Sequence, residues 1–119
     1  MKISHLSKKV GDKTILNDIS CDFSLTGIVS LFGPSGAGKS SLLYAIAGLD
    51  KSVTGSIIIE QQEITKLSNI ERNEFLKEKI AFIFQDNQLI PFLNIQDNLL
   101  INRSYVIDEK YYSLLNIKN

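Results

Sequence analysis

The sequence predicts an α/β fold in which a buried strand runs through a glycine-rich loop into a helix. The apolar run at 27–32 has the length and character of a buried strand. The next residues, 33–41, read G-P-S-G-A-G-K-S-S, and leucine and isoleucine then recur at helical spacing over 42–49. A loop between a strand and the N-terminus of a helix predicts a phosphate-binding site.

Two strands are predicted ahead of this loop. Ile3 and Leu6 mark a short first strand, and residues 10–13 predict a turn. Apolar and polar side chains then alternate within 15–25, which predicts a half-buried strand. Cys21 occupies an apolar position of this alternation, so its thiol is predicted to be buried.

Beyond the loop helix, which Gly48 is expected to end, apolar runs alternate with charged segments. The run at 55–60 predicts a strand before a turn at 61–62, and the run at 80–84 predicts a buried strand. Further helices are predicted at 69–78, 94–101 and 108–115.

The composition is typical of one small globular domain, with 119 residues of which 44% are hydrophobic and 22% charged. The formal net charge of 0 gives no reason to expect nucleic acid as a partner. No apolar run approaches the roughly 18 residues that span a bilayer. We therefore expect no direct membrane insertion, and any membrane attachment is expected to go through a partner.

The loop has the chemistry to hold a nucleoside triphosphate. Glycine permits a tight path and close approach of phosphate, and backbone N–H groups at a helix N-terminus attract anions. Lys39 is expected to reach the β and γ phosphates, and the Ser40 hydroxyl to ligate Mg²⁺. The predicted nucleotide-binding residues of the loop are Gly33, Ser35, Gly36, Ala37, Gly38, Lys39, Ser40 and Ser41.

The order of motifs over residues 1 to about 100 resembles the nucleotide-binding subunits of ABC transporters. The loop with its doubled serine is followed by A-G-L at 47–49 and by T-G-S-I at 54–57. F-Q at 84–85 and L-I-P at 89–91 are similar to the Q-loop of that family and the segment after it. The F-Q-x-x-x-L-x-P spacing most resembles the subfamily for lipoprotein release, macrolide export and bacteriocin export.

This resemblance implies a P-loop NTPase fold, ABC ATPase-like, with an antiparallel β subdomain. Residues 1–119 would be the N-terminal part of an ABC-type ATP-binding domain, with ATP and Mg²⁺ as cofactors. The family's signature motif L-S-G-G-Q and its Walker B strand are not found, so the core sheet is expected to be incomplete and 28–32 to have unpaired apolar edges. The run at 105–109 ends in Asp-Glu as a Walker B strand does, but Asp108 is read more simply as a helix N-cap.

Two positions outside the loop take roles from the resemblance. Gln85 would contact Mg²⁺ and the attacking water beside the catalytic Lys39, and would couple nucleotide state to transport; the alternative is a strand-ending surface residue. Val10 stands where the family has an aromatic residue that stacks on adenine, and His5 is an alternative base contact.

The resemblance implies an ATPase subunit that powers export of a peptide, lipoprotein or drug. Its partners would be a transmembrane permease and a second ATP-binding subunit in a homodimer, on the cytoplasmic side of the cell membrane. Residues 1–119 alone are expected to show negligible ATP hydrolysis. The alternatives are a truncated, non-enzymatic remnant that binds nucleotide or a partner, and a small nucleotide kinase, which is disfavoured because Arg72 and Arg103 are the only arginines.

Overall fold

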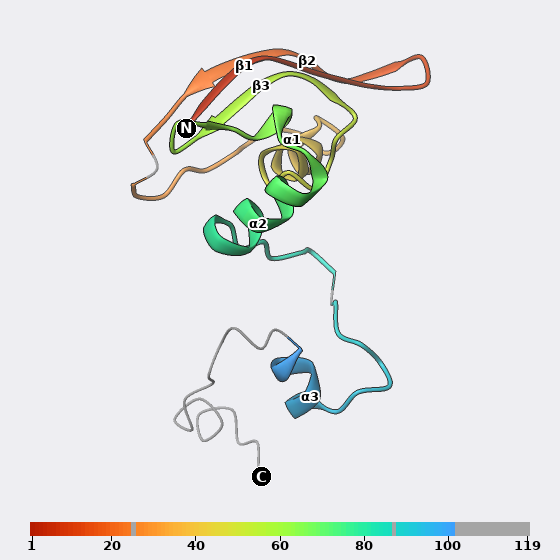
Figure 1. The fold of residues 1–119 in the computed structure, drawn as a ribbon. Helices are drawn as coiled ribbons and strands as arrows, with labels where there is room; N and C mark the ends of the chain where they lie inside the picture. Colours follow the sequence, from red (N-terminus) through yellow and green to blue (C-terminus); the bar gives the residue numbers. More distant parts are fainter. Residues whose placement is uncertain (25, 87, 102–119) are drawn as a thin grey trace. The chain divides into compact units, whose positions relative to one another are not determined.

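The computed structural model describes residues 1–24, 26–86 and 88–101, and it divides into two units that are treated separately. The first unit is Met1–Phe82 and the second begins at Ile83 (Figure 1). The predicted helix at 108–115 and the run at 105–109 lie outside the described residues.

A four-stranded antiparallel sheet forms the frame of the first unit, in the order β2-β1-β3-β4. Its strands are β1 (Lys2–Val10), β2 (Lys13–Asp22), β3 (Val53–Ile59) and β4 (Gln62–Glu63). The turn predicted at 10–13 is confirmed between β1 and β2, and the turn predicted at 61–62 lies one residue earlier, at 60–61. The predicted antiparallel β subdomain is therefore present.

Strand β1 is irregular at its centre, where His5 and Asp18 face each other with φ of 51° and 49°. The His5 Nδ1 and Asp18 Oδ1 atoms lie 2.8 Å apart, and the His5 N–H donates to the Ser20 hydroxyl at 2.9 Å. On the other side of β1, Gly55 has φ +101°, and a Cβ there would lie 2.4 Å from the His5 carbonyl oxygen. Only glycine fits where β3 approaches the irregular centre of β1 this closely.

Helix α1 covers one face of the sheet (Figure 1). The helical elements are α1 (Lys39–Ile46), the 3-10 turn η1 (Ile64–Lys66), α2 (Asn69–Lys79) and, in the second unit, α3 (Ile95–Leu100). The buried core between sheet and helix comprises Ile3, Leu6, Leu16, Ala45, Ile57, Ile59 and Ile64. Burial of these side chains is the main term that holds α1 on the sheet.

Helix α2 begins where its sequence predicts, because Ser68 and Glu71 form a capping box. The Ser68 hydroxyl accepts from the Glu71 N–H, and the Ser68 N–H donates to Glu71 Oε2 at 2.9 Å. The helix predicted at 94–101 is confirmed as α3, whose N-cap Asn94 accepts from the Asp97 N–H at 2.8 Å.

Three expectations of strand or burial are wrong. Residues 27–32 are not a strand, and Ile28 and Phe32 are 96% and 88% exposed. No described residue pairs with this segment as a strand, and an apolar strand that lacks neighbours cannot be buried. Residues 80–84 do not form a strand either, although the Phe82 ring packs on Tyr44 with 5.4 Å between centroids. Cys21 is exposed because it lies near the end of the edge strand β2.

Candidate functional site

The predicted phosphate loop leads directly into α1, whose N-terminus has no side-chain cap. The N-cap residue Gly38 has φ +87°, and a Cβ there would lie 2.7 Å from the Ile15 carbonyl oxygen of β2. The Leu42 N–H donates to the Gly38 carbonyl at 2.9 Å, and in the loop the Ala37 N–H donates to the Pro34 carbonyl at 3.3 Å. The N–H groups at the start of α1, at 39–41, precede the first intrahelical hydrogen bond and are available to an anion, with the positive end of the helix dipole behind them.

Lys39, the first residue of α1, folds back over the loop. Its Nζ donates to the carbonyl oxygens of Gly33 and Pro34 at 2.9 and 2.6 Å. These two hydrogen bonds hold the ammonium group against the start of the loop, beside the exposed residues 33–37. Ser40 is also exposed, so its hydroxyl is open to solvent, and Ser41 is half-buried. The structure thus brings the predicted loop residues together around one lysine.

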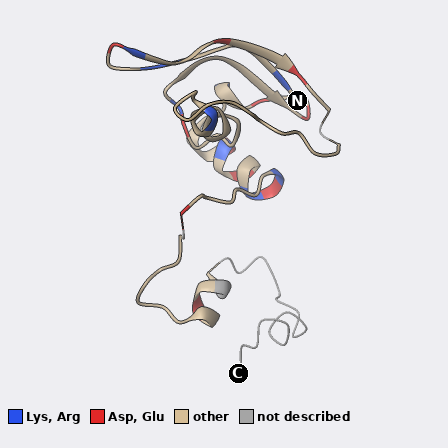
Figure 2. Ribbon diagram, turned by 180° about the vertical axis from the view of Figure 1, so that it is seen from behind, with Lys and Arg blue, Asp and Glu red and all other residues tan. Residues whose placement is uncertain are grey.

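The charge pattern around the loop favours an anion. Lys39 is the only charged residue between Asp22 and Asp50, and Figure 2 shows the distribution of basic and acidic residues along the ribbon. No acidic side chain lies in the first turn of α1. A phosphate at this position would therefore meet no neighbouring carboxylate along the loop.

The loop fits the phosphates of ATP by its donor set: a helix N-terminus without a cap, a lysine and a glycine-rich backbone. The exposed Ser40 hydroxyl is a hard oxygen donor that suits Mg²⁺. In the described residues no group of three or more His, Cys, Asp or Glu side chains is arranged to hold a metal. Within the described loop, the Ser40 hydroxyl is therefore the candidate protein ligand for Mg²⁺.

The remaining predicted residues lie outside this loop. Gln85 is exposed at a bend in the second unit, and its contact with Mg²⁺ and the attacking water stays a prediction. Val10 is 59% exposed at the end of β1, opposite Lys13, and the loop contacts β2 farther along, at Ile15 and Leu16.

Asn98 has a role that the sequence did not reveal. Its side-chain amide accepts from the Ile90 N–H at 2.7 Å and donates to the carbonyls of Ile90 and Leu93 at 3.2 and 3.0 Å. One side chain of α3 thereby fixes the segment around Pro91 that follows Gln85. The sequence offers one signal for these hydrogen bonds, which is a polar residue inside a short helix that follows a proline turn.

A half-buried ion pair ties β1 to the segment that follows α1. Lys8 Nζ donates to the Asp50 carboxylate, and both side chains are about one-sixth exposed. Burial raises the pKa of Asp50, but hydrogen bonds from Lys8 and Ser52 outweigh it and hold that pKa below its usual value. This pair anchors the end of α1 and so supports the loop at its start.

The sequence matches the model of the ABC transporter family over residues 16–118, which is most of the chain. The chain belongs to the ABC transporter family. A solved structure of the ATP-binding cassette MJ0796, dimeric and bound to ADP and Pi, resembles the fold with a TM-score of 0.77 at 29% identity, over 94% of this chain and 52% of that one. The predicted ABC ATPase-like fold is confirmed.

Curated relatives include both importers and exporters. The phosphonates import ATP-binding protein PhnC of Fusobacterium nucleatum is 40% identical over the whole chain, which spans 43% of that protein. The lipoprotein-releasing system ATP-binding protein LolD of Leptospira interrogans is 35% identical over 85% of the chain and 43% of its own length. The macrolide export protein MacB of Campylobacter jejuni is 34% identical over 87% of the chain and 16% of its own length. The family is established, but the export subfamily is not singled out.

No described helix has the length and apolar character needed to cross a bilayer.

Proposed function

We propose that this chain supplies the phosphate-binding part of the ATP-binding subunit of an ABC transporter. The observation that carries the proposal is the open N-terminus of α1, with Lys39 held over the loop by the Gly33 and Pro34 carbonyls. The family membership and the fold support ATP as the nucleotide. The chain spans less than half the length of these curated relatives, so the activity of the whole subunit belongs to the proposal.

Each residue of the loop takes one task. The backbone N–H groups of 36–41 hold the phosphate oxygens, and Lys39 leaves its carbonyl partners to pair with the β and γ phosphates. Ser40 is the protein ligand of Mg²⁺, and bound Mg²⁺ supplies charge neutralisation for phosphoryl transfer. Gln85 orients water and senses the nucleotide from the second unit, as an uncharged group that both donates and accepts hydrogen bonds.

The proposed partners are a transmembrane permease and a second ATP-binding subunit. The named relatives are ATP-binding components of transport systems, and the matched cassette MJ0796 is dimeric. These partners would place the protein at the cytoplasmic face of the membrane. The F-Q-x-x-x-L-x-P spacing favours export as the direction of transport. Import is the competing direction, because one relative is named as a phosphonates import protein.

Calorimetric titration of the chain with ATP and Mg²⁺ tests this function. Lys39→Ala removes the one charge at the loop, so we expect affinity to fall at least tenfold, since a charge-assisted hydrogen bond contributes about 1.5–3 kcal/mol. The matched control is Lys13→Ala, at the exposed start of β2, which should bind as the parent does. Equal affinity in the parent and Lys39→Ala would overturn the proposal.

A further inference from the structure

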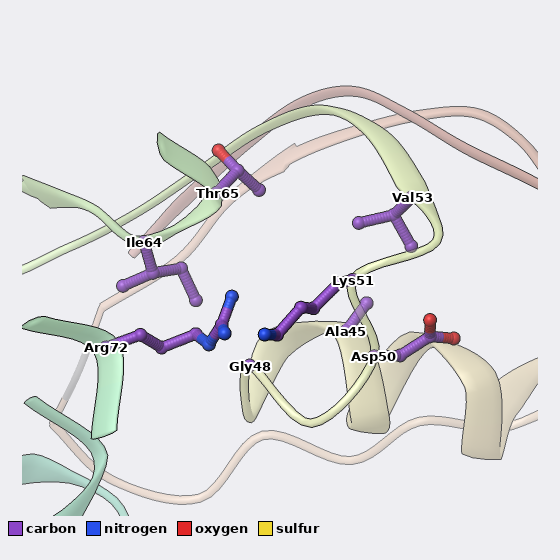
Figure 3. Close-up of a pocket in the computed structure, with 8 residues that line it drawn as sticks. All are labelled: Ala45, Gly48, Asp50, Lys51, Val53, Ile64, Thr65 and Arg72. Atoms are coloured by element: carbon purple, nitrogen blue, oxygen red, sulfur yellow. The ribbon is translucent and has the colours of Figure 1, made fainter. Parts of the chain in front are cut away.

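A cavity of about 50 Å³ lies beneath the sheet, apart from the phosphate loop, between the end of α1, the start of β3, η1 and α2. Two cationic side chains enter it from opposite sides. Figure 3 shows the Arg72 guanidinium and the Lys51 ammonium directed toward each other across this space, with the Asp50 carboxylate turned away. The cavity is large enough for water or a small ion and too small for a nucleotide.

Arg72 is the only charged residue among the buried side chains of the described chain, at 7% exposure. Its Nη2 donates to Asn69 Oδ1 at 2.8 Å, and Lys51 Nζ donates to the same oxygen. Neither cation has a carboxylate partner among the described residues, since the Asp50 carboxylate binds Lys8 and Ser52. Two positive charges therefore share one neutral amide oxygen, whereas buried charges are normally paired with an opposite charge.

The remaining donors of Arg72, Nε and Nη1, are accessible from the cavity. No buried side-chain nitrogen or oxygen in the described residues lacks a hydrogen-bond partner. Nε and Nη1 of Arg72 bond to none of these residues, so both atoms keep accessible surface. Arg72 is otherwise enclosed, and the cavity is the space that it lines. Gly48 packs against the Arg72 side chain from the α1 side, where a Cβ would lie 3.2 Å from Arg72 Cδ.

We propose that Lys51 and Arg72 form a binding site for a small free oxyanion of the sulfate or phosphate class, independent of the phosphate loop. A guanidinium offers paired N–H donors that match two oxygens of such an ion, and an ammonium adds a third donor from the opposite side. The ion joins the loop after α1 to α2. The competing account is that both cations serve only the carbonyl end of α1, whose last turn has no basic residue of its own.

The test uses the chain with Lys39→Ala, so that the phosphate loop does not contribute. Sodium sulfate, and inorganic phosphate as a second probe, are titrated at constant ionic strength set with chloride, and ¹H–¹⁵N spectra follow the Thr65 and Asn69 amides and Arg72 Nε–H. We expect saturable shifts at these three groups. Lys51→Gln should weaken the apparent affinity at least fivefold, and the matched Lys13→Gln should leave it unchanged.

Lys51 is exposed, so its replacement is expected to leave the fold intact, and the same spectra report this directly. Shifts that persist equally in Lys51→Gln would mean an adventitious ion only and would overturn the site. Absence of saturable shifts in the Lys39→Ala chain would overturn it as well. Both results are independent of whether the phosphate loop binds ATP.

Discussion

Lys39 is the only charged residue within 23–49, and its surroundings explain why the proposed phosphate binding depends on this one side chain. Its ammonium group donates to two neutral carbonyl oxygens of the loop. When phosphate oxygens replace these carbonyls as acceptors, the ammonium gains an opposite charge and the loop needs little rearrangement. The start of a helix at the end of this loop could be predicted from the sequence because the glycine-rich motif encodes backbone geometry directly. The opposed pair Lys51 and Arg72 could not, since only the fold brings them together.

Gly38→Ala should destabilise the chain more than Gly11→Ala. Both glycines have positive φ, at +87° and +56°, but a Cβ at Gly38 would lie 2.7 Å from the Ile15 carbonyl oxygen, whereas nothing lies within 4 Å at Gly11. We expect a loss of about 1 kcal/mol for Gly11→Ala from the backbone alone. The loss for Gly38→Ala should be about 2–4 kcal/mol, because a backbone clash is added. Urea denaturation of both variants measures the difference, and equal losses would contradict it.

Asp50 should make stability depend on pH in the acid range. Its pKa is lower in the folded than in the unfolded chain, so its stabilising effect is full above the unfolded value of about 3.9 and is lost as pH falls through the folded pKa. Asp50→Asn should cost about 1–3 kcal/mol at pH 7 and flatten the pH profile of the unfolding midpoint below about pH 5. Asp12→Asn, at the exposed β1–β2 turn, is the control. A profile for Asp50→Asn as steep as the parent's would contradict this assignment.

At the scale of elements, the predictions of the hairpin, α2 and α3 are confirmed, and the structure shows that a turn glycine, a capping box and an Asn cap, each acting within a few residues, set their boundaries. The predictions failed where burial depends on partners distant in sequence. Residues 28–32 have the composition of a buried strand, yet no described strand lies beside them. The exposure of Cys21 has the same origin, since β2 is an edge strand.

The capping box of α2 gives a prediction at this scale. Ser68→Ala removes the acceptor for the Glu71 N–H and should lower the unfolding free energy by about 1 kcal/mol. Ser68→Asp retains an acceptor at the N-cap and should keep most of the stability. Thermal unfolding followed by circular dichroism compares the two. A loss in Ser68→Asp equal to that in Ser68→Ala would show that the cap is not the cause.

At the scale of the whole molecule, the chain presents apolar side chains that a folded protein normally covers. Ile28 and Ile83 are 96% and 95% exposed, and Phe92 is 85% exposed. Extended apolar segments without strand partners favour pairing with another chain. The similar cassette MJ0796 was solved as a dimer.

The 119-residue chain by itself should therefore self-associate. Light scattering over a range of concentrations should show a mass above that of the monomer, and Ile28→Lys should shift the chain toward the monomer by placing a charge on the apolar segment. Lys2→Ile, which leaves residues 28–32 intact, is not expected to do so. A monodisperse parent monomer with one cooperative melting transition would contradict this prediction.

The binding of ATP phosphates by the loop is the central claim, and ¹H–¹⁵N spectra of the chain titrated with ATP and Mg²⁺ test it most directly. We predict the largest shifts in the amides of residues 36–41, and their loss in Lys39→Ala with the rest of the spectrum preserved. Shifts that are centred elsewhere, or that persist unchanged in Lys39→Ala, would contradict the claim.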